Sequence, residues 1–231
     1  MREGKQRKDV FAMNIFVINP VGTSRWDRAD KEYLERFARR DTVVTVASLS
    51  SGPESIEDYR SKALVCPEIL KLARKNARKY DAMFVNCFGD PCVEAVQEVT
   101  KIPVPAVGET SMMMASLLGD KFAVISPTRN TALQVESNAR RMGLDIGTFS
   151  VVPLEIPVLQ LERNRRRTIR EIVKVAKKCL INGAEVIVLG CTGMAYMADE
   201  IRKKIQAPLI EPASLTLKVA ETLVDLKIVR H

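Results

Sequence analysis

Histidine is almost absent from this chain, because the only one among its 231 residues is His231. A Ser-His-Asp triad, a histidine general base and a histidine-rich metal site are therefore effectively excluded. Aromatic residues make up only 5%, and none interrupts the densest basic cluster, residues 163–170. Bases would have no stacking platform there, so we expect no nucleic-acid partner despite a formal net charge of +8.

Long apolar runs are also missing, and none approaches the roughly 18 residues of a membrane span. We therefore expect no membrane partner. The opening MREGKQRKDV is polar and basic, so we expect no secretory signal. The five cysteines are an odd, unevenly spaced set in a chain too long to need disulfide staples. These features predict a cytoplasmic protein with free thiols, in which Cys66, Cys92 and Cys179 are small buried hydrophobes.

What the chain does have is an alternation of short apolar runs with longer segments of helical periodicity. This order is typical of an α/β protein with parallel strands. The strands are expected at 14–19, 42–49, 81–87, 103–108, 121–126, 149–154, 184–191 and 207–212. The helices are expected near 27–40, 67–79, 91–100, 110–118, 129–142, 164–182, 194–205 and 213–227.

The chain also repeats itself at an offset of about 105 residues. Cys87 and Cys191 end the third and seventh strands, and Pro103 and Pro208 open the fourth and eighth. The repeat predicts two pseudo-symmetric lobes, each a four-stranded parallel sheet flanked by helices. We expect a basic N-terminal tail at 1–12, a first lobe at 13–119 and a second at 120–231, with the last helix a candidate to pack back on the first lobe.

Ligands of open parallel sheets bind beyond the carboxyl ends of the strands. Two facing lobes would therefore bring Cys87 and Cys191 to one cleft from opposite sides. Each is followed by a glycine within two residues and then by an expected helix, whose N-terminus would lower the thiol pKa toward neutrality. A metal site is disfavoured, because these cysteines have neither His partners nor CxxC spacing.

One thiolate and one thiol across a gap make a proton acceptor and a proton donor. That pair suits inversion of a carbon acid, in which one face of a stereocentre loses a proton and the other gains one. The backbone N–H groups of Phe88, Gly89, Thr192 and Gly193 are candidates to hold the developing enolate oxygen. No cofactor is required for this chemistry.

The motifs around these cysteines resemble those of the Asp/Glu/hydantoin racemase superfamily. Residues 87–91 read Cys-Phe-Gly-Asp-Pro, as in hydantoin racemases, and residues 190–194 read Gly-Cys-Thr-Gly-Met, with Thr192 where those enzymes have alanine. The resemblance runs from Met13 to about Leu226. It implies two α/β lobes, catalytic roles for Cys87 and Cys191, and racemisation at C5 of 5-substituted hydantoins, with allantoin as a close cousin.

A neutral hydantoin ring needs only amide-like hydrogen bonds, whereas a free amino acid needs charged clamps. The polar residues at the expected strand ends are neutral: Asn19, Ser51, Thr110, Ser126, Thr128 and Thr192. We take Asn19, Ser51, Thr128 and Thr192 as candidate substrate contacts, with ordinary turn or cap roles as the alternative. Asp90 is also a candidate, although an N-cap role before Pro91 already explains it.

Other functions stay open at this point. The nearest is an amino-acid racemase of the same superfamily, with aspartate as the first candidate. A non-catalytic ligand-binding protein or a basic RNA-associated protein would belong to a different class, and the paired thiols argue against both. The resemblance further implies a small-molecule substrate and a homo-oligomer.

Overall fold

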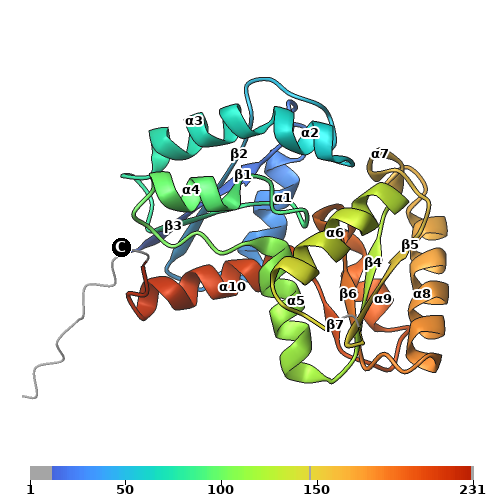
Figure 1. The fold of residues 1–231 in the computed structure, drawn as a ribbon. Coiled ribbons are helices and arrows are strands. Elements are labelled where there is room, and N and C mark those ends of the chain that lie inside the picture. Colours follow the sequence, from blue (N-terminus) through green and yellow to red (C-terminus); the bar gives the residue numbers. More distant parts are fainter. Residues whose placement is uncertain (1–11, 146, 230–231) are drawn as a thin grey trace, which may run out of the picture.

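The computed structural model describes residues 12–145 and 147–229, so the expected basic tail lies almost entirely outside the described residues. The chain forms two parallel sheets, which Figure 1 shows side by side. The first has the order β2-β1-β3 and the second the order β5-β4-β6-β7. The strands are β1 (Met13–Asn19), β2 (Thr42–Ser48), β3 (Ala82–Val85), β4 (Phe122–Ser126), β5 (Phe149–Pro153), β6 (Val186–Leu189) and β7 (Leu209–Ile210). The predicted α/β class with two lobes is confirmed.

Helices separate the strands along the chain. They are α1 (Asp27–Glu35), α2 (Tyr59–Leu64), α3 (Cys66–Asn76), α4 (Val93–Val99), α5 (Val107–Leu118), α6 (Arg129–Arg141), α7 (Val158–Leu161), α8 (Arg165–Ile181), the 3-10 helix η1 (Thr192–Met197), α9 (Ala198–Arg202) and α10 (Pro212–Asp225). The short helices α2 and α7 were not predicted. No helix in the described ranges is long and apolar enough to cross a bilayer.

Strand β1 shows why its sheet is covered on both sides. Ile15 and Val17 point to the face covered by α1 and α10, whereas Phe16 and Ile18 point to the face covered by α3 and α4. All four side chains are nearly or fully buried. A continuous apolar run is therefore required, because alternate residues serve two separate cores.

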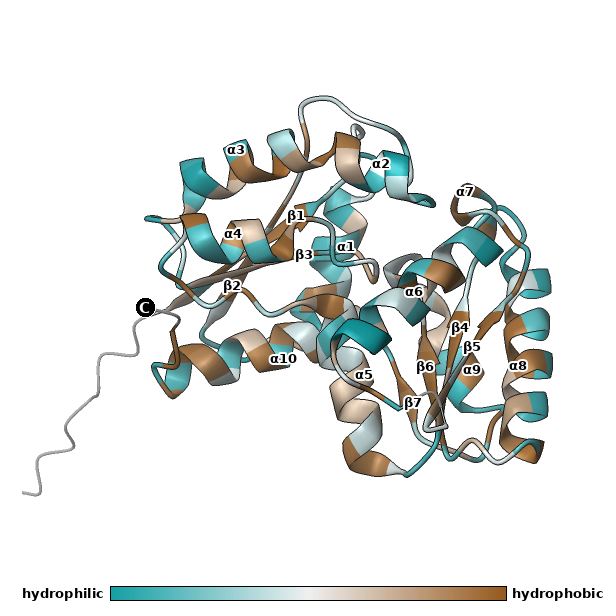
Figure 2. Ribbon diagram, viewed as in Figure 1, coloured by the Kyte–Doolittle hydropathy of each residue, from teal (hydrophilic) through white to brown (hydrophobic). Residues whose placement is uncertain are grey.

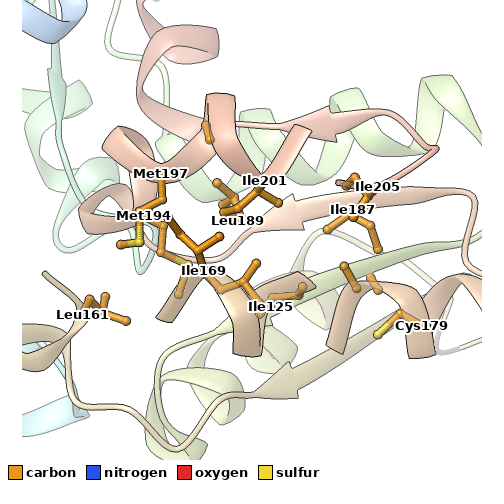
Figure 3. Close-up of a cluster of buried hydrophobic side chains, with 14 residues drawn as sticks. Ile125, Leu161, Ile169, Cys179, Ile187, Leu189, Met194, Met197, Ile201 and Ile205 are labelled. Atoms are coloured by element: carbon orange, nitrogen blue, oxygen red, sulfur yellow. The ribbon is translucent and has the colours of Figure 1, made fainter. Parts of the chain in front are cut away.

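The second sheet is built in the same way. One face carries α8, η1 and α9, and Figure 3 shows Ile125 and Leu189 of the sheet packed with Met194, Met197 and Ile201. The other face carries α5 and α6. Figure 2 shows the corresponding pattern on helices such as α3 and α8, in which hydrophobic and hydrophilic residues alternate along the ribbon.

The two halves of the chain exchange a helix. Helix α5 follows the first sheet in sequence, yet its Met112 and Ala115 pack with Phe122 and Val186 of the second sheet. Helix α10 ends the second half, yet its Leu217 packs with strand β1 of the first sheet. Each sheet is therefore completed by a helix from the other half of the sequence (Figure 1).

Three predictions about local structure are wrong. The run at 103–108 forms no strand, because Pro103 and Pro105 have no N–H for a ladder and α5 already begins at Val107. The first sheet accordingly has three strands instead of four. Likewise, Asp90 does not cap a helix starting at Pro91, since α4 begins at Val93 with Cys92 as its N-cap residue.

The third concerns the cysteines. Cys66 and Cys92 were expected to be free, but they are joined in a disulfide with a Cα–Cα distance of 5.6 Å. Cys66 begins α3 and Cys92 precedes α4, and these helices cover the same face of the first sheet. Their meeting is a tertiary contact, which cysteine spacing does not reveal. Cys179 is free and buried, as predicted.

Candidate active site

Cys87 and Cys191 lie just beyond the carboxyl ends of β3 and β6, one in each lobe. Their side chains line the same two adjoining cavities, together with Thr192. The two strands hold equivalent places, because β3 pairs with β1 and β6 pairs with β4, the first strand of each half of the chain. The structure therefore brings together the two thiols that the sequence predicted to face one another.

The environment of the thiols opposes their ionisation. Burial raises the pKa of Cys87 to about 11 and that of Cys191 to about 12. Backbone N–H groups of Gly89 and Gly193 donate to the respective sulfurs and act in the other direction. The sequence-based expectation of a pKa near neutrality is therefore wrong. At Cys87 the expected helix start is also missing, because α4 begins six residues further on.

Asp90 fixes the loop that carries Cys87 to the N-terminus of α5. Both carboxylate oxygens of Asp90 accept hydrogen bonds from the N-terminus of α5, at Gly108 N (2.9 Å) and Glu109 N (3.0 Å). Burial raises the pKa of Asp90 to about 7. The residue thus caps a helix that begins 17 residues later in the sequence and anchors the Cys87 loop to it.

Lys62 of α2 holds the same loop from the side. Its Nζ donates to the carbonyl of Gly89 at 2.5 Å, and its positive charge favours the thiolate form of Cys87. Sequence analysis did not single out Lys62, because nothing in a short helical segment indicates which lysine turns toward a distant loop.

The larger of the two cavities has a volume of about 110 Å³ and opens between the lobes. Its lining residues include Asn19, Pro20, Val21, Arg25, Trp26, Asp30, Glu54, Ser55, Ile56, Asn86, Val158, Leu159, Glu162, Gly193 and Tyr196. The smaller cavity, of about 40 Å³, adjoins the larger one at the cysteines. Its lining residues include Phe88, Gly89, Pro127, Thr131, Gln134, Val135 and Gly190.

A network of hydrogen bonds beside the larger cavity connects the two lobes. Asn19 Nδ2 donates to Asp27 Oδ1 and to Asp30 Oδ2, both at 2.8 Å, and the hydroxyl of Tyr196 in the second lobe donates to Asp30 Oδ1. Asn86 Nδ2 in turn donates to Asn19 Oδ1 at 3.0 Å. The side-chain amide of Asn19 is thereby fully engaged within the protein.

The predicted substrate contacts fall into two groups. Asn19, Phe88, Gly89, Thr192 and Gly193 line one or both cavities. Ser51, Asp90 and Thr128 lie outside these two linings. Ser51 and Thr128 are nevertheless on the right segments, because Glu54 to Ile56 of the same loop line the larger cavity and Thr131 of α6 lines the smaller one. Thr128 itself is the N-cap of α6.

Several lining residues were not predicted. Asp30 and Tyr196 lie within helices, whereas Trp26 directly precedes α1 and Glu162 directly follows α7. Charged or aromatic residues at such positions are usually expected to face the solvent. Gln134 of α6 is 3% exposed, and among the residues that the structure describes its Nε2 has no hydrogen-bond partner. A polar residue at a core position of a helical pattern is the one signal that would have pointed to it.

The Asp/Glu/Hydantoin racemase family profile matches residues 15–220. The chain belongs to this family. The hydantoin racemase of Pseudomonas sp. (strain NS671) is 32% identical over 216 residues, which cover 93% of this chain and 87% of that protein.

Solved structures agree with the family assignment. The allantoin racemase from Klebsiella pneumoniae superposes with a TM-score of 0.89 and 25% identity, covering 95% of this chain and 90% of that one. The glutamate racemase from Francisella tularensis shares the fold at a TM-score of 0.68 and 16% identity, covering 94% of this chain and 82% of that one. The protein is accordingly a racemase of the Asp/Glu/hydantoin family.

Proposed function

We propose that this racemase inverts C5 of 5-substituted hydantoins by two-base proton transfer between Cys87 and Cys191, without a cofactor. The observation that carries the proposal is that one thiol from each lobe lines the same cavities, and each sulfur accepts a backbone N–H from the glycine two residues on. The same proposal includes a cytoplasmic location and a homo-oligomeric state.

In the proposed reaction, the thiolate of one cysteine removes the C5 proton and leaves an enolate whose negative charge rests on the ring C4 oxygen. The thiol of the other cysteine then protonates the opposite face. The two cysteines have exchanged protonation states at the end, so the reverse reaction runs from the other enantiomer. Burial supports this division of labour, because it disfavours two thiolates in one cavity.

Neutral amide groups around the thiols favour a ring over a free amino acid. Gln134 lines the smaller cavity, and its Nε2, which has no partner among the described residues, offers a donor to a ring carbonyl. Among the described residues the smaller cavity has no Lys or Arg in its lining to clamp a carboxylate. This observation makes an aspartate-type racemase the second candidate.

Proton NMR in D₂O with a reducing agent tests the proposal by following loss of the C5 proton from each enantiomer of 5-benzylhydantoin, 5-isopropylhydantoin and allantoin. L-Aspartate and L-glutamate serve as the amino-acid arm. We expect exchange of hydantoins from both enantiomers, and none above the uncatalysed rate in the Cys87→Ala/Cys191→Ala double variant. Cys179→Ala, which removes a thiol outside the cavities, should behave like the unaltered protein.

The single variants distinguish two bases from one. With Cys87→Ser or Cys191→Ser, racemisation should stop, while solvent exchange persists for one enantiomer only, and for opposite enantiomers in the two variants. Exchange confined to the amino acids would reject the hydantoin assignment. Loss of exchange from both enantiomers in only one of the variants would reject the two-base mechanism.

A further inference from the structure

The walls of the larger cavity carry a charge opposite to that of the chain as a whole. The protein has a formal net charge of +8, yet Asp30, Glu54 and Glu162 line this cavity against a single basic residue, Arg25. Among the described residues, none of these carboxylates has a Lys or Arg nitrogen within 4.0 Å. Arg25 instead lies over the ring of Trp26, 4.3 Å from its centroid.

The hydrogen-bonding groups that line the larger cavity also favour a ligand that donates hydrogen bonds. Asn86 is 8% exposed and lines the cavity with an Oδ1 that has no partner among the described residues. Two neutral donors of the lining are already engaged, since Asn19 Nδ2 binds two carboxylates and the Tyr196 hydroxyl binds Asp30. The wall therefore offers acceptors and negative charge, and it suits a ligand with N–H donors and positive charge.

The pKa of Asp30 reflects the excess of negative charge in this cavity. Its pKa is raised to about 6, mainly by burial and also by the neighbouring carboxylates of Asp27 and Glu162, against the hydrogen bonds from Tyr196 and Asn19. A cation placed beside Asp30 and Glu162 would relieve this repulsion and favour the ionised form of Asp30.

Apolar side chains line the rest of the same cavity: Pro20, Val21, Trp26, Ile56, Val158 and Leu159. A cavity with apolar walls and carboxylates matches a flexible alkyl stem that ends in an ammonium or guanidinium group, because such side chains bury their methylenes and direct the charge to a partner. A compact aryl or branched alkyl group would leave the carboxylates without a cationic partner.

The smaller cavity, which shares both cysteines with the larger one, has a different lining. Within the described ranges its lining has no Asp, Glu, Lys or Arg, and Gln134 supplies a free amide N–H. A neutral hydantoin ring fits this side. Because both cysteines line both cavities, a ring in the smaller cavity and C5 between the sulfurs would direct the C5 substituent into the larger, acidic one.

From this arrangement we propose that the larger cavity is a specificity subsite for cationic C5 substituents, so that the preferred substrates are hydantoins bearing ω-aminoalkyl or ω-guanidinoalkyl chains. The proposal rests on the hydantoin racemase function proposed above. It assigns Asp30 and Glu162 to binding of the cationic end and the apolar residues to its stem.

The decisive experiment compares 5-(4-aminobutyl)hydantoin with 5-pentylhydantoin, which has a methyl group in place of the ammonium and the same chain length. We expect kcat/KM for C5 exchange to be about tenfold higher for the aminobutyl compound, the size of one charge-assisted hydrogen bond. Allantoin, whose ureido group is rich in N–H donors but neutral, separates donor capacity from charge and should lie between the two.

Variants connect the preference to the subsite. Glu162→Gln should lower the aminobutyl-to-pentyl ratio several-fold, and adding Asp30→Asn should bring it close to one. Glu98→Gln, which removes the same charge from the exposed side of α4, should leave the ratio unchanged. A ratio at or below one in the unaltered protein, or one that survives the double substitution, would overturn the proposal.

Binding measured without turnover keeps the two proposals apart. In the Cys87→Ala/Cys191→Ala double variant, calorimetric titration should give a lower Kd for the aminobutyl than for the pentyl compound. If neutral hydantoins exchange but the cation brings no gain in rate or affinity, the subsite is wrong and the racemase function stands. If no hydantoin exchanges or binds, both fail.

Discussion

At the scale of single residues, two opposing effects determine the pKa of each thiol. The prediction from the sequence misjudged which of them is larger. A glycine N–H on each sulfur favours the thiolate, but burial between the lobes costs more and raises the pKa of Cys87 and Cys191 to about 11 and 12. The motif around a cysteine reveals the nearby N–H groups, whereas the depth of the cavity depends on the opposite lobe.

These pKa values predict how thiol reactivity depends on pH. Well below its pKa, a thiol has about tenfold more thiolate for each pH unit, so alkylation of Cys87 and Cys191 by iodoacetamide should rise by that factor per unit from pH 7 to 9. Mass spectrometry after timed quenching measures each site separately. A plateau between pH 7 and 8 would show that the anion is stabilised after all.

The same measurement can test the effect of the Lys62 charge on Cys87, with Cys191 as the internal control. Its charge lowers the pKa of Cys87 and is not among the influences on Cys191. In Lys62→Met, alkylation of Cys87 should slow relative to that of Cys191 at any pH in this range. Equal slowing at both sites would point to a general change in the cavity.

The residues of the site divide into those that a sequence reveals and those that it does not. Cys87 and Cys191 were predictable because each follows a buried strand and the pair repeats at the lobe spacing. Asp30 and Glu162 were not, because they approach one another only across the lobes. Asp90 was assigned to the nearest helix, while its actual partners at Gly108 and Glu109 are distant in sequence.

At the scale of elements, the N-terminus of α5 is the support on which the Cys87 loop rests. Asp90 caps it, and Gly108 in its first turn lies against the loop backbone. A β-carbon at Gly108 would lie 2.2 Å from the carbonyl oxygen of Phe88, the residue after Cys87. The run PVPAVG was expected to be a strand because it is apolar, but its role is to bring this helix start under the loop.

Gly108→Ala should therefore damage the site. Helix propensity alone would make alanine favourable by about 1 kcal/mol, but the clash is with backbone and requires the loop to move. We expect a net destabilisation of about 1–3 kcal/mol and a loss of roughly 100-fold in C5 exchange, the typical effect of misplacing a reacting group by about 1 Å.

Thermal unfolding and C5 exchange together check this prediction. Ser116→Ala, an exposed position on the same helix, is the matched control and should change neither quantity appreciably. Unaltered exchange in Gly108→Ala would mean that the loop tolerates the displacement and that α5 does not position Cys87.

At the scale of the whole molecule, the exchange of α5 and α10 couples the two lobes. Neither sheet can be covered by its own half of the chain alone, since Met112 is needed by the second core and Leu217 by the first. The sequence repeat predicted two lobes, but it could not reveal this crossing, because both helices are amphipathic whichever sheet they cover. A cavity between the lobes gains a fixed geometry from it.

This coupling predicts that the protein unfolds as one unit. Leu217→Ala removes a fully buried side chain from the first core and should cost about 3 kcal/mol, or about 10 °C in Tm for a chain of this length. Because α10 also continues from β7 of the second sheet, a single transition should persist and move as a whole. Ile181→Ala, at an 85% exposed position on α8, should shift Tm little.

Hydrogen exchange measures which strands lose stability in Leu217→Ala. If the crossing helices unite the lobes, Leu217→Ala should lower the protection of slowly exchanging amides in β4 and β6 as much as in β1 and β3, because both open in the same global event. A loss confined to the first sheet, or a second calorimetric transition, would instead mean that the lobes open separately. In that case the distance between the thiols would vary with inter-lobe motion, and the cavity would not be held by the fold alone.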